Sequence, residues 1–279
     1  MRRILVATDM TEGAHEALGR ACAMSRDAKS EICIVHVLPA SADQDERSIV
    51  RSKLRDQIAG FPGAPGSFEL DLSIRLPRGE PAEAILAEAE RFKPDLIILG
   101  AHGEPRFRDV IFGTTASHVA RAAKQPVLIV QTDHNLPYER LLVAIDDSSA
   151  QEILRVAANI DSATDLFVVH AHGSAGQSLF GGERLDDVRA GQEAMTRDLL
   201  AIVKDLRPGA TALRIHNIVE EGEAIEVIMK AWTDVKPDLL VMGTRGRTGL
   251  PRLLRGSHAE IAMLGCTSDI LIVRTHLQD

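Results

Sequence analysis

The chain has 279 residues, which predicts one large domain or two small ones, and either is long enough to bury a hydrophobic core. Acidic residues outnumber basic ones by 40 to 32, the net charge is −8, and aromatic residues make up only 3% of the chain. Nucleic-acid-binding proteins typically carry a basic surface or a platform of stacking aromatic side chains, so the composition argues against nucleic acid as the main partner.

Targeting and redox signals are also weak in this sequence. No apolar run approaches the roughly eighteen residues that a membrane-spanning helix needs. The apolar run at residues 4–7 ends at Thr8, well short of the core of a secretory signal. The cysteines Cys22, Cys33 and Cys266 are odd in number and lack CxxC spacing, which argues against a disulfide framework or a zinc site. We therefore expect a cytoplasmic protein whose cysteines are small apolar core residues.

Five apolar runs in the first half are rich in Leu and β-branched residues, as expected of strands buried on both faces of a parallel sheet. They cover residues 3–8, 31–37, 69–75, 95–99 and 126–130. Helical patterns lie between them, and one apolar helix face consists of Ala82, Ile85, Leu86, Ala89 and Phe92. This alternation predicts an open, doubly wound parallel sheet of Rossmann-like type, with ligands beyond the carboxyl ends of the strands.

The chain repeats itself with a period near 140 residues. Residues 4–9 match residues 141–146 with an offset of 137. Residues 79–82, 93–100 and 127–130 match residues 222–225, 236–243 and 270–273 with an offset of 143, and the second apolar helix face is Ile225, Ile228, Met229, Trp232 and Val235. A period this long fits two duplicated domains rather than a solenoid. The sequence thus predicts tandem five-stranded α/β sandwiches over residues 1–137 and 138–279.

A glycine-rich loop follows the fourth predicted strand of each half. In the first half Gly100 and Gly103 are followed, after nine residues, by Gly113 and Thr114. The second half has the same spacing, with Gly243, Gly246, Gly256 and Ser257. Glycines let the backbone approach an anion, and the helix that follows offers free N–H groups to a phosphate. The alternative is that these residues only end a strand and cap a helix.

On these motifs the chain resembles the universal stress protein family, in the tandem form with two such domains. The resemblance implies a five-stranded α/β sandwich and, in members that carry this loop, binding of ATP, for which we expect accompanying Mg²⁺. It implies that the eight loop residues hold the ribose and phosphates. It also implies that Asp9 and Asp146 contact the nucleoside, and that Val37 offers its backbone to adenine. Ala171 takes the position of Val37 in the second half.

Other interpretations of these polar residues stay open. Asp9 and Asp146 each precede Thr or Ser and a helical pattern, so helix capping is as good an explanation as ligand contact. His36 and His170 precede the adenine positions and are better explained as strand-end histidines with satisfied hydrogen bonds than as ligands. His170 and His172 have the spacing of a metal pair, but no third ligand is evident, so no metal site is predicted.

The two loops differ in charge. Between Gly100 and Thr114, two arginines (Arg106, Arg108) are balanced by Glu104 and Asp109, whereas the second loop carries Arg245, Arg247, Arg252 and Arg255 without an acidic residue. Arginine supplies charge-assisted, often bidentate donors to phosphate oxygens. We therefore expect the second site to bind ATP more tightly, with Arg245 and Arg247 among its ligands.

An enzymatic function is less well supported than a regulatory or protective one. The turn after the first strand lacks G-x-G-x-x-G, and no Walker lysine follows a glycine loop. No catalytic residue is therefore predicted, although slow ATP hydrolysis stays an alternative, as does another ligand held by the insertions at residues 39–68 and 172–210. The resemblance further implies that the two halves pair through their last strands, residues 127–130 and 270–273, and a homodimer is a further option.

Overall fold

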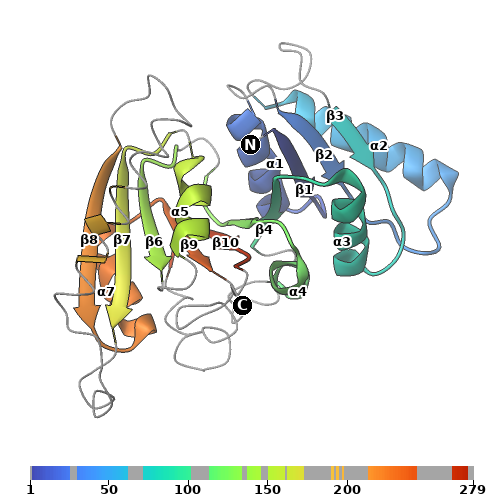
Figure 1. Cartoon of the computed structure of the whole chain (residues 1–279). Coiled ribbons are helices and arrows are strands. Elements are labelled where there is room, and N and C mark those ends of the chain that lie inside the picture. Colours follow the sequence, from blue (N-terminus) through green and yellow to red (C-terminus); the bar gives the residue numbers. More distant parts are fainter. Residues whose placement is uncertain are drawn as a thin grey trace. The chain divides into compact units, whose positions relative to one another are not determined.

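The computed structural model describes residues 2–25, 30–61, 72–101, 113–133, 137–145, 150–160, 162–172, 190–191, 193–194, 197, 213–243 and 266–275. The chain divides into two compact units, Met1–Leu136 and Pro137–Asp279 (Figure 1). No helix among the described residues is both long enough and apolar enough to cross a membrane.

The first unit is a parallel sheet with helices on both faces. Its elements are β1 (Arg3–Ala7), α1 (Glu12–Ser25), β2 (Glu31–Val35), α2 (Gln44–Ala59), β3 (Leu72–Arg75), α3 (Pro81–Phe92), β4 (Leu96–Gly100), α4 (Thr114–Ala122) and β5 (Val127–Val130). The strands run in the order β3-β2-β1-β4-β5, and Leu5 of β1 pairs with Cys33 on one side and Ile97 on the other. Helix α1 packs against α2, and α3 packs against α4. Right-handed crossovers place these two pairs on opposite faces, because the chain reverses direction across the sheet after β3.

The second unit repeats this arrangement. Its described elements are β6 (Arg140–Ile145), α5 (Ala150–Ala158), β7 (Asp165–His172), β8 (Arg214–Glu221), α7 (Ala224–Val235), β9 (Leu239–Gly243) and β10 (Asp269–Val273). The strands are parallel and run in the order β10-β9-β6-β7-β8. The predicted α/β fold, with five parallel strands in each half, is therefore confirmed.

The central strands supply the core, as their continuous apolar runs predict. The side chains of β1, β4, β6 and β9 are almost entirely inaccessible, except for Arg3 and Arg140 at the starts of β1 and β6. The predicted helix face of α3 is buried at Ala82, Ile85, Ala89 and Phe92, and Leu86 is half-buried. In α7 the prediction is less accurate, because Ile228 is buried while Ile225, Met229, Trp232 and Val235 are half-buried. Val227 and Ala231 of α7 are buried instead, so this helix is rotated relative to the expected face.

The repeated Lys-Pro-Asp segment has a structural function in both units. Oδ2 of Asp95 accepts hydrogen bonds from the backbone N–H groups of Arg2 and Arg3, at 2.8 and 3.0 Å. Oδ2 of Asp238 accepts the corresponding bonds from Glu139 and Arg140, at 3.0 and 2.8 Å. These carboxylates satisfy N–H groups at the start of the first strand of each unit, which would otherwise lack a protein partner.

The three cysteines are free and buried, as predicted. Burial is the largest influence on the thiols of Cys33 and Cys266, and it raises the pKa of both. For Cys266 the pKa rises to about 11. Because the thiolate is the reactive form, these side chains act as inert core residues.

Candidate functional site

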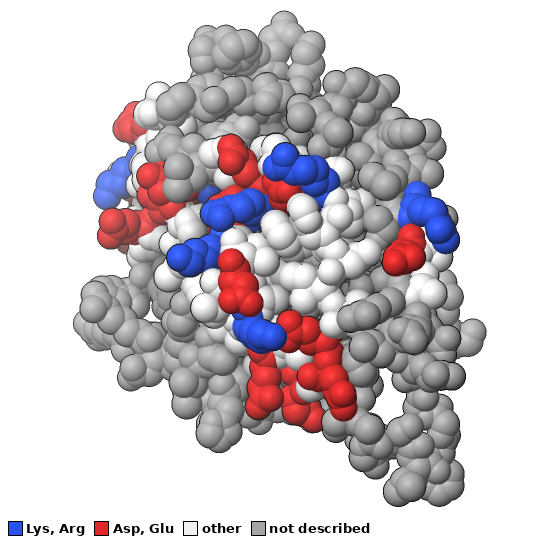
Figure 2. Space-filling model, turned by 90° about the vertical axis from the view of Figure 1, so that its left-hand side faces the viewer, with Lys and Arg blue, Asp and Glu red and all other residues white. Residues whose placement is uncertain are grey.

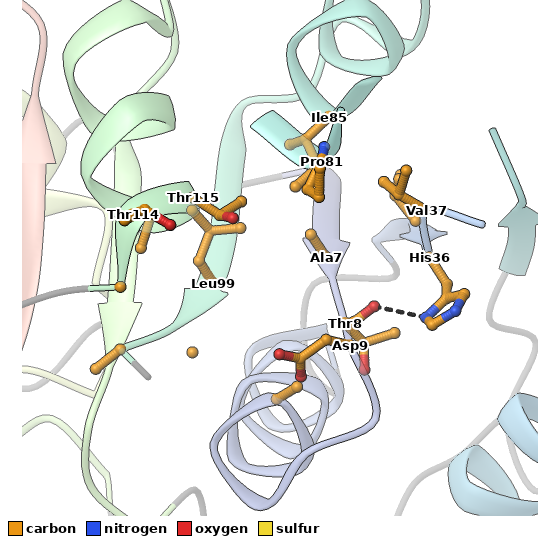
Figure 3. Close-up of a pocket in the computed structure, with 16 residues that line it drawn as sticks. Ala7, Thr8, Asp9, His36, Val37, Pro81, Ile85, Leu99, Thr114 and Thr115 are labelled. Carbon is orange, nitrogen blue, oxygen red and sulfur yellow. Dashed lines mark hydrogen bonds between the residues drawn. The ribbon is translucent and has the colours of Figure 1, made fainter. Parts of the chain in front are cut away.

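A cavity of about 390 Å³ opens in the first unit at the carboxyl ends of its strands. It lies between β1 and β4, where the chain connections diverge to opposite sides of the sheet, which is the usual ligand position in such folds. Figure 3 shows side chains from several elements around it. The lining residues are Ala7, Thr8, Asp9, Ala14, Val35, His36, Val37, Pro81, Ile85, Leu99, Gly100, Ala101, Gly113, Thr114, Thr115 and Ala116.

Asp9 lies at the mouth of this cavity, directly after β1. Its Oδ1 accepts a hydrogen bond from the Thr11 backbone N–H at 3.0 Å and another from the Thr11 hydroxyl. Its second oxygen, Oδ2, makes no hydrogen bond with a described residue. The N-cap of α1 is Thr11 rather than Asp9, because the Ala14 N–H donates to the Thr11 hydroxyl at 3.4 Å and the His15 N–H donates to the Thr11 carbonyl at 2.9 Å. Asp9 holds Thr11 in place through Oδ1, and Oδ2 stays available to a ligand.

His36 and Val37 form the opposite wall, just past the end of β2. Nδ1 of His36 lies 2.9 Å from the Thr8 carbonyl oxygen, the contact drawn as a dashed line in Figure 3. The His36 backbone N–H donates to the Arg75 carbonyl at 3.1 Å, and the Leu38 N–H donates to Pro77 at 2.8 Å. The backbone groups of Val37, between them, have no hydrogen-bond partner among the described residues. Val37 thus presents one backbone donor and one backbone acceptor without a described partner at this wall of the cavity.

The start of α4 closes the cavity on the side of β4. Gly113 is the N-cap, with φ −55° and ψ 157°, and no side chain caps this helix. Of the motif residues it is therefore Gly113 that caps the helix, whereas Thr114 is the first helical residue and its hydroxyl is not a cap. The first intrahelical bond runs from the Ser117 N–H to the Gly113 carbonyl at 2.9 Å. The N–H groups of Thr114, Thr115 and Ala116 therefore lack intrahelical acceptors and lie at the cavity.

Gly100 is required by close packing rather than by an unusual backbone conformation. A Cβ added at Gly100 would lie 2.6 Å from the carbonyl oxygen of Gly13, in the first turn of α1. The Gly113 N–H donates to the Ala101 carbonyl at 2.8 Å, which draws together the two ends of the loop at residues 102–112. The loop glycines thus position α1, β4 and α4 around the cavity.

The structure brings five of the predicted site residues to this cavity, namely Asp9, Val37, Gly100, Gly113 and Thr114. In the second unit, Ala171 lies in β7 and Gly243 ends β9, and both are buried. Outside the described residues lie Gly103, Asp146, Arg245, Gly246, Arg247, Gly256 and Ser257. No group of three or more potential metal ligands comes together in the described parts of the chain.

Sequence reasoning did not assign the apolar and hydroxyl walls of the cavity. Pro81 and Ile85 of α3 and Thr115 of α4 line it, together with Thr8. The available signal for Pro81 was the Gly79-Glu80 pair before it, which recurs as Gly222-Glu223 and places the start of α3 at the same sheet edge as the glycine loop. Asp9 is the one formally charged side chain in the described lining, so the positive end of the α4 helix dipole is the source of positive potential among the described parts of the cavity.

Comparison with known proteins identifies relatives along the whole chain. The model of the universal stress protein family matches residues 1–131 and again residues 137–274. A universal stress protein E homolog of Haemophilus influenzae is 24% identical, with 95% of each chain covered. A solved universal stress protein from Archaeoglobus fulgidus superimposes with a TM-score of 0.69 at 18% identity, covering 98% of each chain. A solved protein from Pseudomonas aeruginosa, titled as a putative universal stress protein, has a TM-score of 0.60 at 22% identity, covering 99% of this chain and 94% of its own.

Proposed function

Because this chain belongs to the universal stress protein family, in its tandem two-domain form, we propose that it binds ATP in the service of a regulatory or protective role in stress. The observation that carries the proposal is the cavity between β1 and β4, which brings together Asp9, Val37, Gly113 and Thr114 from three separate parts of the sequence. Its volume of about 390 Å³ falls in the range of about 300–1,000 Å³ that small-molecule sites occupy.

The residues present fit an adenine nucleoside. The side chains of Ala7, Ile85 and Leu99 provide an apolar environment for a flat base. The N–H and C=O groups of Val37, which have no partner among the described residues, match the donor and acceptor edge of adenine. The Asp9 Oδ2, which has no described partner, is suited to accept a hydrogen bond from a ribose hydroxyl.

The start of α4 fits the phosphates. Three backbone N–H groups without intrahelical acceptors, together with the Thr114 hydroxyl, supply donors at the positive end of a helix dipole. Mg²⁺ would accompany the triphosphate, since it binds phosphate oxygens and keeps several of its waters. Gly103 completes the proposed set for the first unit, through the loop at residues 102–112.

For the second unit we propose an equivalent site that binds ATP more tightly. It consists of Asp146, Ala171, Gly243, Gly246, Gly256 and Ser257, with Arg245 and Arg247 as donors to the phosphates. The reason is charge: residues 244–255 contain four arginines and no acidic residue, while the first loop is neutral. Screening over about 8 Å at physiological salt makes this local difference matter more than the net charge of each half.

The test is to denature the purified protein and quantify the released nucleotide by chromatography. Gly113→Asp and Gly256→Asp each place a carboxylate where a phosphate is proposed to bind, so each is expected to abolish occupancy of its own site. Gly60→Asp is the matched control, because Gly60 is an exposed residue after α2 that does not line the cavity. Binding measured after ATP and Mg²⁺ are added distinguishes a site that was purified empty from a site that does not bind ATP.

The outcomes separate the two sites. About two ATP per chain, each lost with its own loop variant, supports binding in both units. About one ATP, lost with Gly256→Asp alone, supports the charge argument and assigns the first cavity to a weaker or different ligand. No released nucleotide and no binding of added ATP would contradict the proposal. Loss of nucleotide in Gly60→Asp as well would mean that the substitutions act through folding.

A further inference from the structure

A second, chemically different cavity lies at the outer edge of the first unit, and nothing in the proposed function uses it. It has a volume of about 500 Å³ and shares no lining residue with the cavity between β1 and β4. Five of its lining residues are arginines: Arg47 and Arg51 lie in α2, Arg75 ends β3, Arg78 lies in the segment after β3, and Arg91 lies in α3. We call this cavity the arginine groove.

We propose that the arginine groove binds a compact polyanion that carries two or three phosphate groups. Glu88 is the one carboxylate among the described lining residues, so five guanidinium groups leave an excess of four positive charges. A phosphate monoester carries about −1.5 to −2 charges at pH 7, so two or three phosphates would balance this excess. Guanidinium groups also match phosphate oxygens in bidentate geometry.

Two of the arginines hold the walls of the groove in place. Arg51 donates from its guanidinium to the Ile74 carbonyl at 3.4 Å, which connects α2 to the edge strand β3. Arg78 donates to the Ala42 carbonyl, which connects the segment after β3 to the residues before α2. Each bond uses one of the five N–H donors of a guanidinium group, so most donors of both side chains remain available to a ligand.

The remaining arginines are less committed to the fold. Arg91 forms an ion pair with Glu88 at 2.6 Å, and Glu88 is buried at 8% exposure. Arg47 and Arg75 have no ion pair with any described carboxylate, and the structure leaves both at least partly exposed. Glu88 thus neutralises one arginine at the base of the groove and leaves the positive charge of the others unbalanced.

The second unit provides an internal comparison, because its pairing register identifies the equivalent positions. Val35 of β2 pairs with Arg75 of β3, and the equivalent Val169 of β7 pairs with Ile218 of β8. Arg75 therefore corresponds to Ile218, so the offset of 143 residues holds between β3 and β8. By the same offset, Arg78 corresponds to Glu221 and Arg91 to Asp234.

Three cationic positions of the first unit are therefore apolar or acidic in the second. Figure 2, which looks onto the side of β8 and α7, shows acidic side chains gathered in a group near the lower part of this face. The arginine groove is therefore not a general property of the repeated fold.

The experiment is a calorimetric titration of the full chain with inorganic triphosphate. Arg47→Gln combined with Arg75→Gln removes two groove charges. No contact of the Arg47 side chain with the described walls is found, whereas the Arg75 side chain hydrogen-bonds the Cys33 thiol of β2. The matched control combines Arg55→Gln with Arg155→Gln, which removes two exposed arginines, one on α2 and one on α5, that do not line the groove. Arg47→Lys combined with Arg75→Lys keeps the charge and removes bidentate geometry. Thermal melting checks that every variant is folded.

We expect the wild type and the Arg55/Arg155 control to bind one triphosphate per chain in the groove. The Arg47/Arg75 glutamine variant should bind this triphosphate at least 10-fold more weakly. The lysine variant should be intermediate. Titration with ATP distinguishes the source of the phosphates. If the glutamine variant loses a binding event for ATP, the ligand of the groove is a nucleotide. If it loses binding of inorganic triphosphate alone, the ligand is a free polyphosphate. Equal weakening in the groove variant and its control, or no weakening in either, would overturn the proposal.

Discussion

Gly100 and Gly243 end the same strand in the two units, yet they meet different neighbours. A Cβ at Gly100 would lie 2.6 Å from a backbone oxygen of Gly13, whereas a Cβ at Gly243 would lie 3.1 Å from Ile153 Cδ1 and 3.2 Å from Thr275 Cγ2. The repeat aligns Gly13 with Ala150, so α1 can approach β4 by its bare backbone, while the second unit packs side chains there. A shared motif glycine is thus constrained by backbone in one copy and by movable side chains in the other.

The largest effect that follows from this difference is expected at Gly100. Gly100→Ala should lower the free energy of unfolding of the first unit by about 3 kcal/mol, because backbone atoms have to move to relieve the contact. Gly243→Ala should cost about 1 kcal/mol or less, because Ile153 and Thr275 can shift. Urea unfolding measures both: circular dichroism follows both units, and fluorescence of Trp232, the single tryptophan, follows the second.

Gly60→Ala is the control for this comparison, because Gly60 is exposed and its φ of −76° suits any residue. Equal losses at Gly100 and Gly243 would contradict the argument from backbone contact. A larger loss at Gly243 would mean that the core around Ile153 is the less adaptable of the two.

A second prediction concerns a feature that the two units share. Asp95→Ala and Asp238→Ala should each lower the free energy of unfolding by about 2 kcal/mol, because each leaves two strand-start N–H groups without their charged acceptor. Urea unfolding with the same two probes assigns each loss to its unit. Asp56→Ala and Asp234→Ala are matched controls, since both remove exposed acids near the ends of helices. A marked difference between the losses in the free energy of unfolding for Asp95→Ala and Asp238→Ala would show that the shared hydrogen bonds differ in strength.

Much of the fold could be predicted because its signals are periodic and repeated. Continuous apolar runs indicated buried parallel strands, and the duplicated segments indicated two such sheets. The orientation of α7 was harder to predict from the sequence. The spacing of Ile225 and Trp232 suits a helical face, but the burial of Val227 and Ala231 depends on how the helix lies on β7. Tertiary packing of this kind decides between two neighbouring faces that the sequence pattern leaves nearly equivalent.

The candidate site was predictable where it depends on local motifs. Asp9 follows β1, Gly113 and Thr114 end the loop that follows β4, and the carboxyl ends of parallel strands meet at one edge of the sheet. The close approach of Gly100 to Gly13 was not predictable, because it joins residues far apart in sequence. The arginine groove carries no motif either: its charges are distributed from Arg47 to Arg91 and become a cluster through the pairing of β3 with β2.

The smallest predicted effect compares acidic residues at the start of the second strand in each unit. Asp165 bonds Arg214 at Nε and Nη2, at 2.7 and 2.5 Å, and lies 2.9 Å from His216 Nε2, and its side chain is 13% exposed. Within the part of the chain that the structure describes, its counterpart Glu31 pairs with Arg3 alone, at 3.0 Å, and is 37% exposed. The hydrogen bond from Arg214 is the main cause that holds the pKa of Asp165 well below its ordinary value of 3.8, and the bond from His216 is the next.

A carboxyl whose pKa is lower in the folded state stabilises the fold above its unfolded pKa, and this stability is lost as the pH falls toward the folded value. Asp165→Asn should therefore lower the melting temperature at pH 7 by about 2 °C or less, since Arg214 is largely exposed, and the deficit should shrink below pH 4. Glu31→Gln should produce a smaller deficit at pH 7, because its single ion pair is more exposed. A deficit for Asp165→Asn that stays constant from pH 7 to pH 3 would show that the side chain acts through packing rather than through its charge.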